Sequence, residues 1–456
     1  MQKNTQTNEM STGSIPKLFF KLAIPAVIAQ VVNLLYNIVD RIYIGHIPEV
    51  GASALTGVGL FSAILMFITA FSMLAGAGAA PLAAIELGKN DKNQAEKIMT
   101  NAFLLLLIFS AILTVVLYIF APTLLTMFGA SEITLPYAVD YARIYILGIV
   151  FVLIVTGMTP LVTTQGFAKI AMLTTVIGAV INIVLDPIFI FVFDMGVKGA
   201  ATATVISQAV GALWVLRFLT GNKTLLKLRK ENMKLDPKVV GSILALGISP
   251  FIMVSTESLL SISFTTSLAK YGGDVAVGAM TIITSINMLV SMPLQGFTQG
   301  GQPIMSYNYG AGNVDRVKKA FFMQFGVCVA YATLFWGICM LAPNALAGIF
   351  TTDAALAEYA TWAIRIYMAG IFSVGFQISC QQSFMALGQA VISLIMAFLR
   401  KLILLIPLIF ILPNFFADKV FGVFVAEPVS DIIAATVTTT VFFTQYKKIM
   451  AKAGQK

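Results

Sequence analysis

The chain has 456 residues, of which 58% are hydrophobic and only 11% charged, and its mean hydropathy is +0.91. A soluble domain carries roughly a quarter charged residues, so this composition excludes an ordinary soluble protein. The net charge of +9 would suit a nucleic-acid binder, but most of the basic residues fall in loops on one side of the predicted spans, which argues against that function.

Twelve apolar stretches are predicted, each long enough to cross a bilayer. If the N-terminus is cytoplasmic, most Lys and Arg residues lie on the inner side, which predicts a multi-pass protein of the cytoplasmic membrane with both termini inside. Residues 1–15 lack the basic start and apolar core of a cleaved signal, so we expect the first helix to be retained. The predicted spans lie near 16–44, 52–82, 98–122, 133–157, 167–193, 197–219, 239–268, 276–302, 320–347, 354–384, 390–412 and 420–446.

The first span carries polar residues along one helical face. Asn33, Tyr36, Asn37 and Asp40 are spaced i, i+3, i+4 and i+7, which places them on the same side of the helix. An acidic side chain at membrane depth usually marks a functional site, because lipid cannot solvate it. We expect this face to line a water-accessible substrate cavity, with a cation or proton bound at its acidic end.

The second half of the chain repeats the first. The string PLAAIELG (81–88) recurs as PIMSYNYG (303–310), and Arg143-Ile-Tyr-x2-Gly148 recurs as Arg365-Ile-Tyr-x2-Gly370. The offset of about 222 residues and the preserved order indicate an internal duplication. An even number of spans per half makes the repeats parallel, as in many transporters.

The predicted fold is therefore all-α and integral to the membrane, with twelve transmembrane helices in two six-helix lobes. Residues 1–220 form the first lobe, 221–238 a cytoplasmic connector and 239–456 the second lobe. The connector is basic with interleaved leucines, so we expect a solvated linker with a surface helix on the anionic inner leaflet.

A cation site is predicted in the outer half of the first lobe. Asp186 has no acidic counterpart in the second half, where Ile406 occupies the matching position. At about 1.5 Å per residue, Asp40, Asp186 and Thr204 all lie on the order of 10 Å below the outer surface, and Asn182 lies one turn below Asp186. Two carboxylates, an amide and a hydroxyl at one level suit a proton or a sodium ion, a hard cation that prefers oxygen.

The second lobe has acids of its own, in different positions. Glu257 shares a helical face with Ser261, and we expect both to line the substrate cavity. Glu427 and Asp431 are expected to pair with Lys419 or to line an outer vestibule.

Two prolines lie within predicted spans, and the chain has three cysteines and one histidine. Pro25 and Pro187 remove backbone hydrogen bonds and are predicted hinges. Three cysteines within apolar spans make no disulfide framework, and the single histidine excludes a histidine metal cluster.

Three strings carry a family resemblance: IPAVIAQVVNLLYNIVDRIYIGH (24–46), INIVLDPIFIF (181–191) and GVKGAATATVISQ (196–208). They resemble the multidrug and toxic compound extrusion (MATE) family, nearest its MepA-type bacterial drug exporters, and the likeness covers nearly the whole chain. The resemblance implies a V-shaped transporter. It also implies a cation site at Asp40, Asn182, Asp186 and Thr204, a bending proline at Pro25 and an aromatic residue near the site at Tyr36. The helix 7 carboxylate of another branch is similar to Glu257, but the tenth span here has no acid beyond Glu358, so the resemblance does not extend to a second-lobe ion site.

We therefore expect an antiporter that exports structurally diverse, often cationic drugs by alternating access, with no cofactor besides a coupling proton or sodium ion. Asp40 beside Asp186 would hold a proton near neutral pH and release it when a cationic drug arrives. The 21 Met and 34 Phe suit an adaptable, cation-attracting pocket. We expect small-molecule and lipid partners, no nucleic acid, and a monomer.

Three other functions are less well supported by the sequence. A flippase of lipid-linked precursors would need cationic residues in its cavity, and within the spans these are chiefly Arg400 and Lys401. A membrane enzyme would need a nucleophile–base pair or metal cluster, for which no pattern is present. A channel would need a filter-like string.

Overall fold

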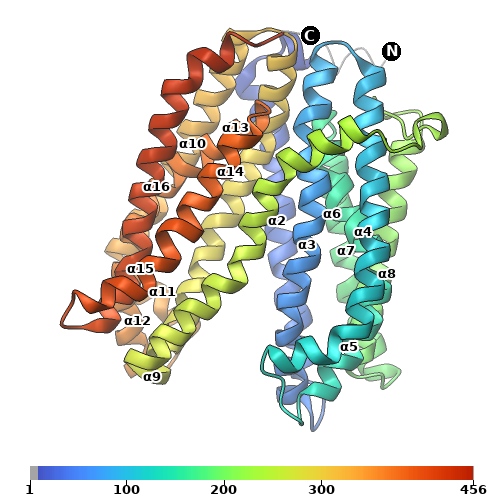
Figure 1. Ribbon diagram of the computed structural model, residues 1–456. Helices are drawn as coiled ribbons and strands as arrows, with labels where there is room; N and C mark the ends of the chain where they lie inside the picture. The colour runs from blue at the N-terminus through green and yellow to red at the C-terminus, as the bar shows by residue number, and fades with distance from the viewer. Residues whose placement is uncertain (1–8, 455–456) are drawn as a thin grey trace.

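Two helical bundles make up the computed structural model, which describes residues 9–454. The bundles converge at the end that carries both described chain ends and diverge towards the other end (Figure 1). Within the described range the regular secondary structure is entirely helical. The predicted all-helical fold in two lobes is confirmed.

The first lobe contains six spans, one of them broken. The fourth span bends by 60° at Gly148, where α5 passes into α6. The fifth continues past Pro187 as a π-helix, η1. The elements are α2 (Ile15–Gly45), α3 (Gly51–Gly88), α4 (Lys92–Met127), α5 (Leu135–Leu147), α6 (Ile149–Thr164), α7 (Ala168–Pro187), η1 (Ile188–Val192) and α8 (Val197–Thr220).

The second lobe begins with α9 (Pro237–Gly310), a run of 74 residues. A straight helix of that length would measure about 110 Å, more than three times the thickness of a bilayer core. The run turns at Gly273 and so forms two spans. The φ of Gly273 is 65°, a value that glycine adopts without the strain that a Cβ would cause. The remaining elements are α10 (Val314–Leu341), α11 (Pro343–Phe350), α12 (Ala354–Tyr367), η3 (Met368–Gly370), α13 (Ile371–Ala386), α14 (Ala390–Phe398), η4 (Leu399–Leu405), α15 (Ile406–Ile411), η5 (Leu412–Asn414) and α16 (Lys419–Met450).

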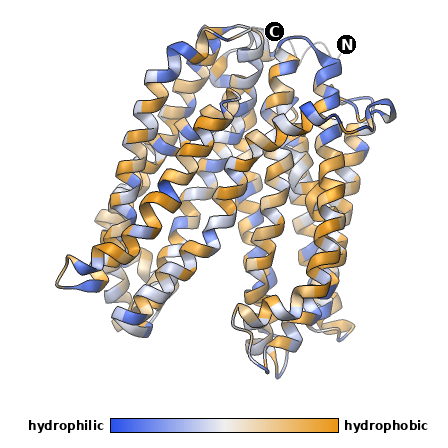
Figure 2. Ribbon diagram, in the orientation of Figure 1, coloured by the Kyte–Doolittle hydropathy of each residue, from blue (hydrophilic) through white to orange (hydrophobic). Residues whose placement is uncertain are grey.

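The number of spans follows from length and apolarity. Among the described residues, ten helices can each cross a membrane, and the bent pair α5–α6 makes one further span. Division of α9 at Gly273 gives twelve, the number predicted from the sequence. Hydrophobic residues dominate the middle of both lobes and hydrophilic ones gather at the ends (Figure 2). Large apolar side chains such as Leu35, Val184 and Leu213 are more than half exposed on the bundle surface, where lipid would cover them. The chain is a multi-pass membrane protein.

The two lobes touch through glycines at the converging end. A Cβ added to Gly247 of α9 would lie 1.9 Å from the carbonyl oxygen of Leu74 in α3. A Cβ on Gly300 would lie 2.4 Å from Cα of Ala23 in α2. Helices that approach this closely need small residues at the crossing.

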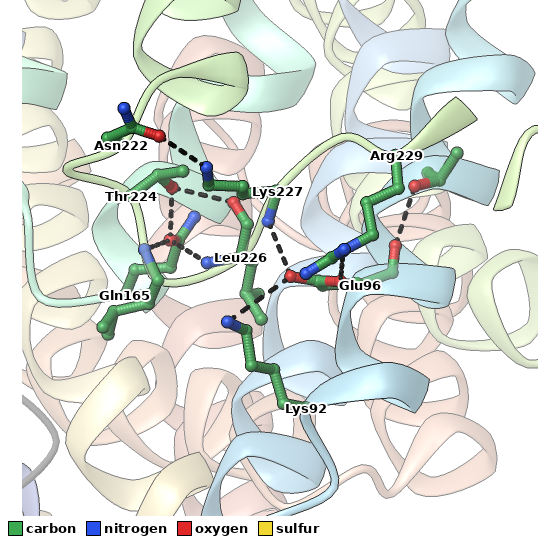
Figure 3. Close-up of polar contacts among 10 residues, drawn as sticks. Lys92, Glu96, Gln165, Asn222, Thr224, Leu226, Lys227 and Arg229 are labelled. Carbon is green, nitrogen blue, oxygen red and sulfur yellow. Dashed lines mark hydrogen bonds and ion pairs between the residues drawn. The ribbon is translucent and has the colours of Figure 1, made fainter. Parts of the chain in front are cut away.

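The connector differs from the sequence expectation. Between Gly221 and Asp236 the only helix is a single 3-10 turn, η2 (Lys230–Asn232), and Leu225 and Leu226 are buried. Gln165 Oε1 accepts hydrogen bonds from the hydroxyl of Thr224 at 2.7 Å and from the backbone N–H of Leu225 and Leu226 at 2.9 and 2.8 Å (Figure 3).

A second anchor lies at buried Glu96 of α4. It accepts from the Lys227 N–H at 3.1 Å and from Arg229 Nε at 2.6 Å (Figure 3). The predicted solvated linker with a surface helix is therefore wrong, because the interleaved leucines and the backbone amides found partners on the first lobe.

Candidate functional site

The predicted acids of the first lobe meet inside the bundle. Asp40 comes from α2 and Asp186 from the last turn of α7, and their carboxyl groups are close neighbours. Asp186 is fully buried and Asp40 is 9% exposed. Neither forms an ion pair with a described side chain, although Arg41 adjoins Asp40 in the sequence.

Asn182 and Thr204 join this acid pair. Asn182 Nδ2 donates to Asp186 Oδ1 at 3.1 Å and to Thr204 Oγ1 at 3.2 Å, and both residues are buried. The i, i+4 spacing on α7 places Asn182 and Asp186 on one face, and α8 supplies Thr204 opposite them. The structure thus brings together the four residues that the sequence predicted at one level; their role in coupling stays a prediction.

Several oxygens of this cluster have no donor. Asp40 Oδ1, Asn182 Oδ1 and Asp186 Oδ2 are buried and make no hydrogen bond within the described part of the chain. Buried polar atoms are almost always paired. With the Thr204 hydroxyl, these oxygens form a donor set that suits a proton or a hard cation such as sodium.

Three tyrosines surround the acids. Tyr36 of α2, Tyr141 and Tyr145 of α5 all lie close to Asp40, and Tyr141 reaches Thr204. The rings of Tyr141 and Tyr145 are stacked with centroids 5.9 Å apart. Of the three, only Tyr36 was predicted from the sequence; the α5 pair was not, although the repeated Arg-Ile-Tyr string contains Tyr145.

No hydrogen bond or ion pair joins the remaining predicted cavity residues to the acid pair among the described side chains. Asn37 Nδ2 donates to the carbonyl of Asn33 at 2.6 Å, within α2 itself, and both residues are half-buried. Glu257 and Ser261 are exposed on α9. The adjacent Ser258 contacts Met66 of α3 at 3.8 Å, so this part of α9 faces the first lobe. We call this surface of the second lobe the interlobe face. A role in substrate binding stays a prediction for all four predicted residues.

The acids of α16 have a partner that the sequence analysis did not assign. Glu427 and Asp431 pair with Arg400 of η4, whereas Lys419 lies over the ring of Tyr271, 5.4 Å from its centroid. The predicted pairing with Lys419 is wrong, because one helical turn of π geometry turns Arg400 towards α16.

The two predicted hinge prolines occupy different positions in their helices. Pro25 lies inside α2 and is buried, without interrupting the helix. Pro187 closes α7 at the change to π-helix. Whether either one moves stays a prediction.

A family model described as MatE matches residues 25–188 and again 250–411, once in each half of the chain. The chain belongs to the MatE family. The resemblance stated from the sequence is confirmed, and the double match to MatE agrees with the duplication inferred from the repeated strings.

Curated relatives of this MatE-family chain include "Multidrug export protein MepA" of Staphylococcus aureus (strain N315), 24% identical over 440 residues and 95% of each chain. The protein of the same name from Staphylococcus haemolyticus (strain JCSC1435) is 25% identical over 438 residues, with the same coverage. At this identity, near-complete coverage of both chains shows a shared architecture.

Solved structures of MATE proteins have the same fold. One described as the outward-facing conformation of a multidrug resistance MATE family transporter superposes with a TM-score of 0.90 at 24% identity, covering 97% of this chain and 98% of that one. One described as MATE in the bent conformation reaches 0.91, covering 98% of both chains.

Proposed function

We propose that this MatE-family chain is a multidrug exporter that exchanges organic cations for a small cation, a proton or a sodium ion, across the cytoplasmic membrane. The names of its curated relatives support drug export. The chemistry of the first lobe supports the exchange.

The observation that carries the proposal is the unpaired acid couple. Asp40 and Asp186 lie side by side in the bundle and form no ion pair with a described side chain. Two adjacent negative charges repel strongly in surroundings of low dielectric constant. They therefore require a proton or a metal cation, and a site with this requirement is the basis of ion-coupled transport.

Sodium fits the same oxygens. Asp40 Oδ1, Asp186 Oδ2, Asn182 Oδ1 and Thr204 Oγ1 would hold it, since all are oxygen donors and three of them have no other partner. A proton would instead be shared between the two carboxyl groups. Both ions neutralise the same charge, so each competes with a cationic substrate.

Exchange then follows from competition. In the arrangement with the lobes diverging, the small cation enters the first lobe and the organic cation leaves. Once the acids are neutralised, the surrounding tyrosines pack around an uncharged pair. The lobes then rock to the arrangement that opens towards the other side of the membrane. There the small cation leaves and the next organic cation binds. Each ligand shifts the equilibrium only by its difference in affinity for the two arrangements.

The test is ethidium accumulation in inverted membrane vesicles with a pH gradient and a sodium gradient imposed separately. We expect one gradient to drive accumulation by the wild type and by Asp194→Asn, a matched change of an exposed aspartate just beyond η1. Asp186→Asn should show none under either gradient. Equal accumulation by Asp186→Asn and wild type would overturn the proposal.

A further inference from the structure

A second group of buried charges lies in the other lobe. Arg400 and Lys401 are consecutive residues of the π-helix η4, and they point to different neighbours. Arg400 Nε donates to Asp431 Oδ1 of α16 at 2.9 Å, and its Nη2 forms an ion pair with the same oxygen at 2.8 Å. Lys401 Nζ donates to Glu257 of α9 and to the carbonyl of Met253 at 2.7 Å.

Glu427 is the poorly partnered member of this group. Its side chain is buried, its Oε1 lies 3.6 Å from Arg400 Nη2, and its Oε2 makes no hydrogen bond within the described residues. The charged and titratable groups that face it are Asp431 on its own helix, Arg400 and Lys401 on η4, Glu257 on α9, and Tyr367 on α12.

The group contains two basic residues and three carboxyls. With every group ionised it would carry one uncompensated negative charge, which is costly because Glu427, Asp431 and Lys401 are buried. Asp431 and Glu257 each accept a hydrogen bond from a cation, and Glu427 does not. A proton on Glu427 makes the group neutral and gives its carboxyl a donor.

We propose that Glu427 is a second proton-exchange site, linked through Arg400 and Lys401 to an organic cation that binds at Glu257. The inference rests on the cation exchange proposed above. Glu257 is the most exposed member of the group, with 52% of its side chain accessible, whereas its partner Lys401 is 7% exposed. We therefore place the organic cation at Glu257. A cation bound there adds one positive charge to a neutral group. Loss of the Glu427 proton to water restores neutrality, so the exchange is one for one.

The duplication gives the site a counterpart. Thr204 in the first lobe corresponds to Glu427, and Tyr145 beside Asp40 corresponds to Tyr367 beside Glu427. Both lobes thus place an acid next to the same tyrosine of the repeated Arg-Ile-Tyr string. In the second lobe Arg400 supplies a fixed cation that the first lobe lacks.

The test is proton release from purified protein in a weakly buffered detergent solution with a pH-sensitive dye, on addition of tetraphenylphosphonium. We expect Glu427→Gln to release about one proton fewer than the wild type. Glu427→Asp, which keeps a carboxyl, and Glu358→Gln, a change of an exposed acid in the same lobe, should release as many as the wild type. Equal release by Glu427→Gln and wild type would overturn the inference.

Asp186→Asn separates this inference from the proposed function and does not depend on how Glu427→Gln folds. It removes the acid pair of the first lobe, so the variant should still release about one proton, from Glu427. No release from Asp186→Asn would overturn the second site. Undiminished release from Asp186→Asn, together with a loss in Glu427→Gln, would instead refute proton exchange in the first lobe and leave the second site standing.

Discussion

Gly88 and Gly310 occupy equivalent positions in the two halves, and each packs against the other's helix. A Cβ on Gly88 would lie 1.9 Å from the carbonyl oxygen of Tyr307, and a Cβ on Gly310 would lie 1.9 Å from the carbonyl oxygen of Ile85. The two glycines end the repeated strings that revealed the duplication. They form a reciprocal contact that holds the lobes together at the converging end.

Gly310→Ala should prevent this close approach. Overpacking of a tight contact costs about 1–3 kcal/mol. This cost applies only to the arrangement in which the ends of α3 and α9 touch, so the substitution destabilises that arrangement. Drug efflux should fall severalfold, and distances between spin labels on the ends of α3 and α9 should lengthen. Gly326→Ala is the control, because nothing lies within 4 Å of its added methyl group. Unchanged distances in Gly310→Ala would contradict the role of the Gly88–Gly310 contact in holding the lobes together.

Asp186→Asn should abolish ethidium efflux from whole cells while expression stays normal. The substitution keeps the size of the side chain and removes the charge that the small and the organic cation compete for. Asp194→Asn should retain efflux. The account of the first lobe fails if the Asp186 variant still exports ethidium normally.

Asp40→Asn should uncouple transport from the ion gradient. Asp186 alone can then still bind a cation. Without the second carboxylate, the small cation and the organic cation no longer displace each other from the site. In proteoliposomes we expect drug flux down its own gradient to persist and gradient-driven accumulation to fall to background. Accumulation at the wild-type level would remove Asp40 from the mechanism.

Glu257→Gln should impair efflux less than Asp186→Asn does, by less than about tenfold, because the acid pair remains intact. Its affinity for tetraphenylphosphonium should fall, since Glu257 is the exposed carboxylate of the interlobe face. The opposite ranking of the two variants would place the main coupling site in the second lobe.

Asp236→Asn should lower thermal stability at neutral pH and not in acid. Hydrogen bonds from Lys97 and from the N–H of Lys238 hold the pKa of Asp236 below its ordinary value. The stabilisation is therefore present above the unfolded value, about 3.9, and is lost as the pH falls through the folded value. Asp418→Asn is the matched control, because Asp418 also caps a helix, α16, without an ion pair to a described residue. A gap between wild type and Asp236→Asn that persists in acid would contradict this explanation.

Sequence reasoning predicted the first-lobe cluster because each member had an independent signal. Helical spacing gave the face of Asp40, comparison of the halves isolated Asp186, and counting of residues gave the common depth. The same reasoning missed Tyr141, whose approach to Thr204 depends on the 60° bend between α5 and α6. A bend of that size leaves no periodic signal in an apolar sequence.

The partners of Glu427 and Asp431 could not be read from the sequence for a similar reason. The π-helix η4 changes the direction in which Arg400 and Lys401 point, and no residue in Leu399–Leu405 predicts π geometry. The docking of the connector was hidden as well, because it depends on two side chains, Gln165 and Glu96, whose donors lie far away in the sequence.

The anchoring of the connector means that its peptide link is not what keeps the halves together. A chain cut after Thr220 would leave Thr224, Leu226 and Arg229 on the second fragment and Gln165 and Glu96 on the first, with every hydrogen bond between them still available. We therefore expect the two halves, expressed as separate polypeptides, to associate in the bilayer through these hydrogen bonds and the glycine contacts between the lobes.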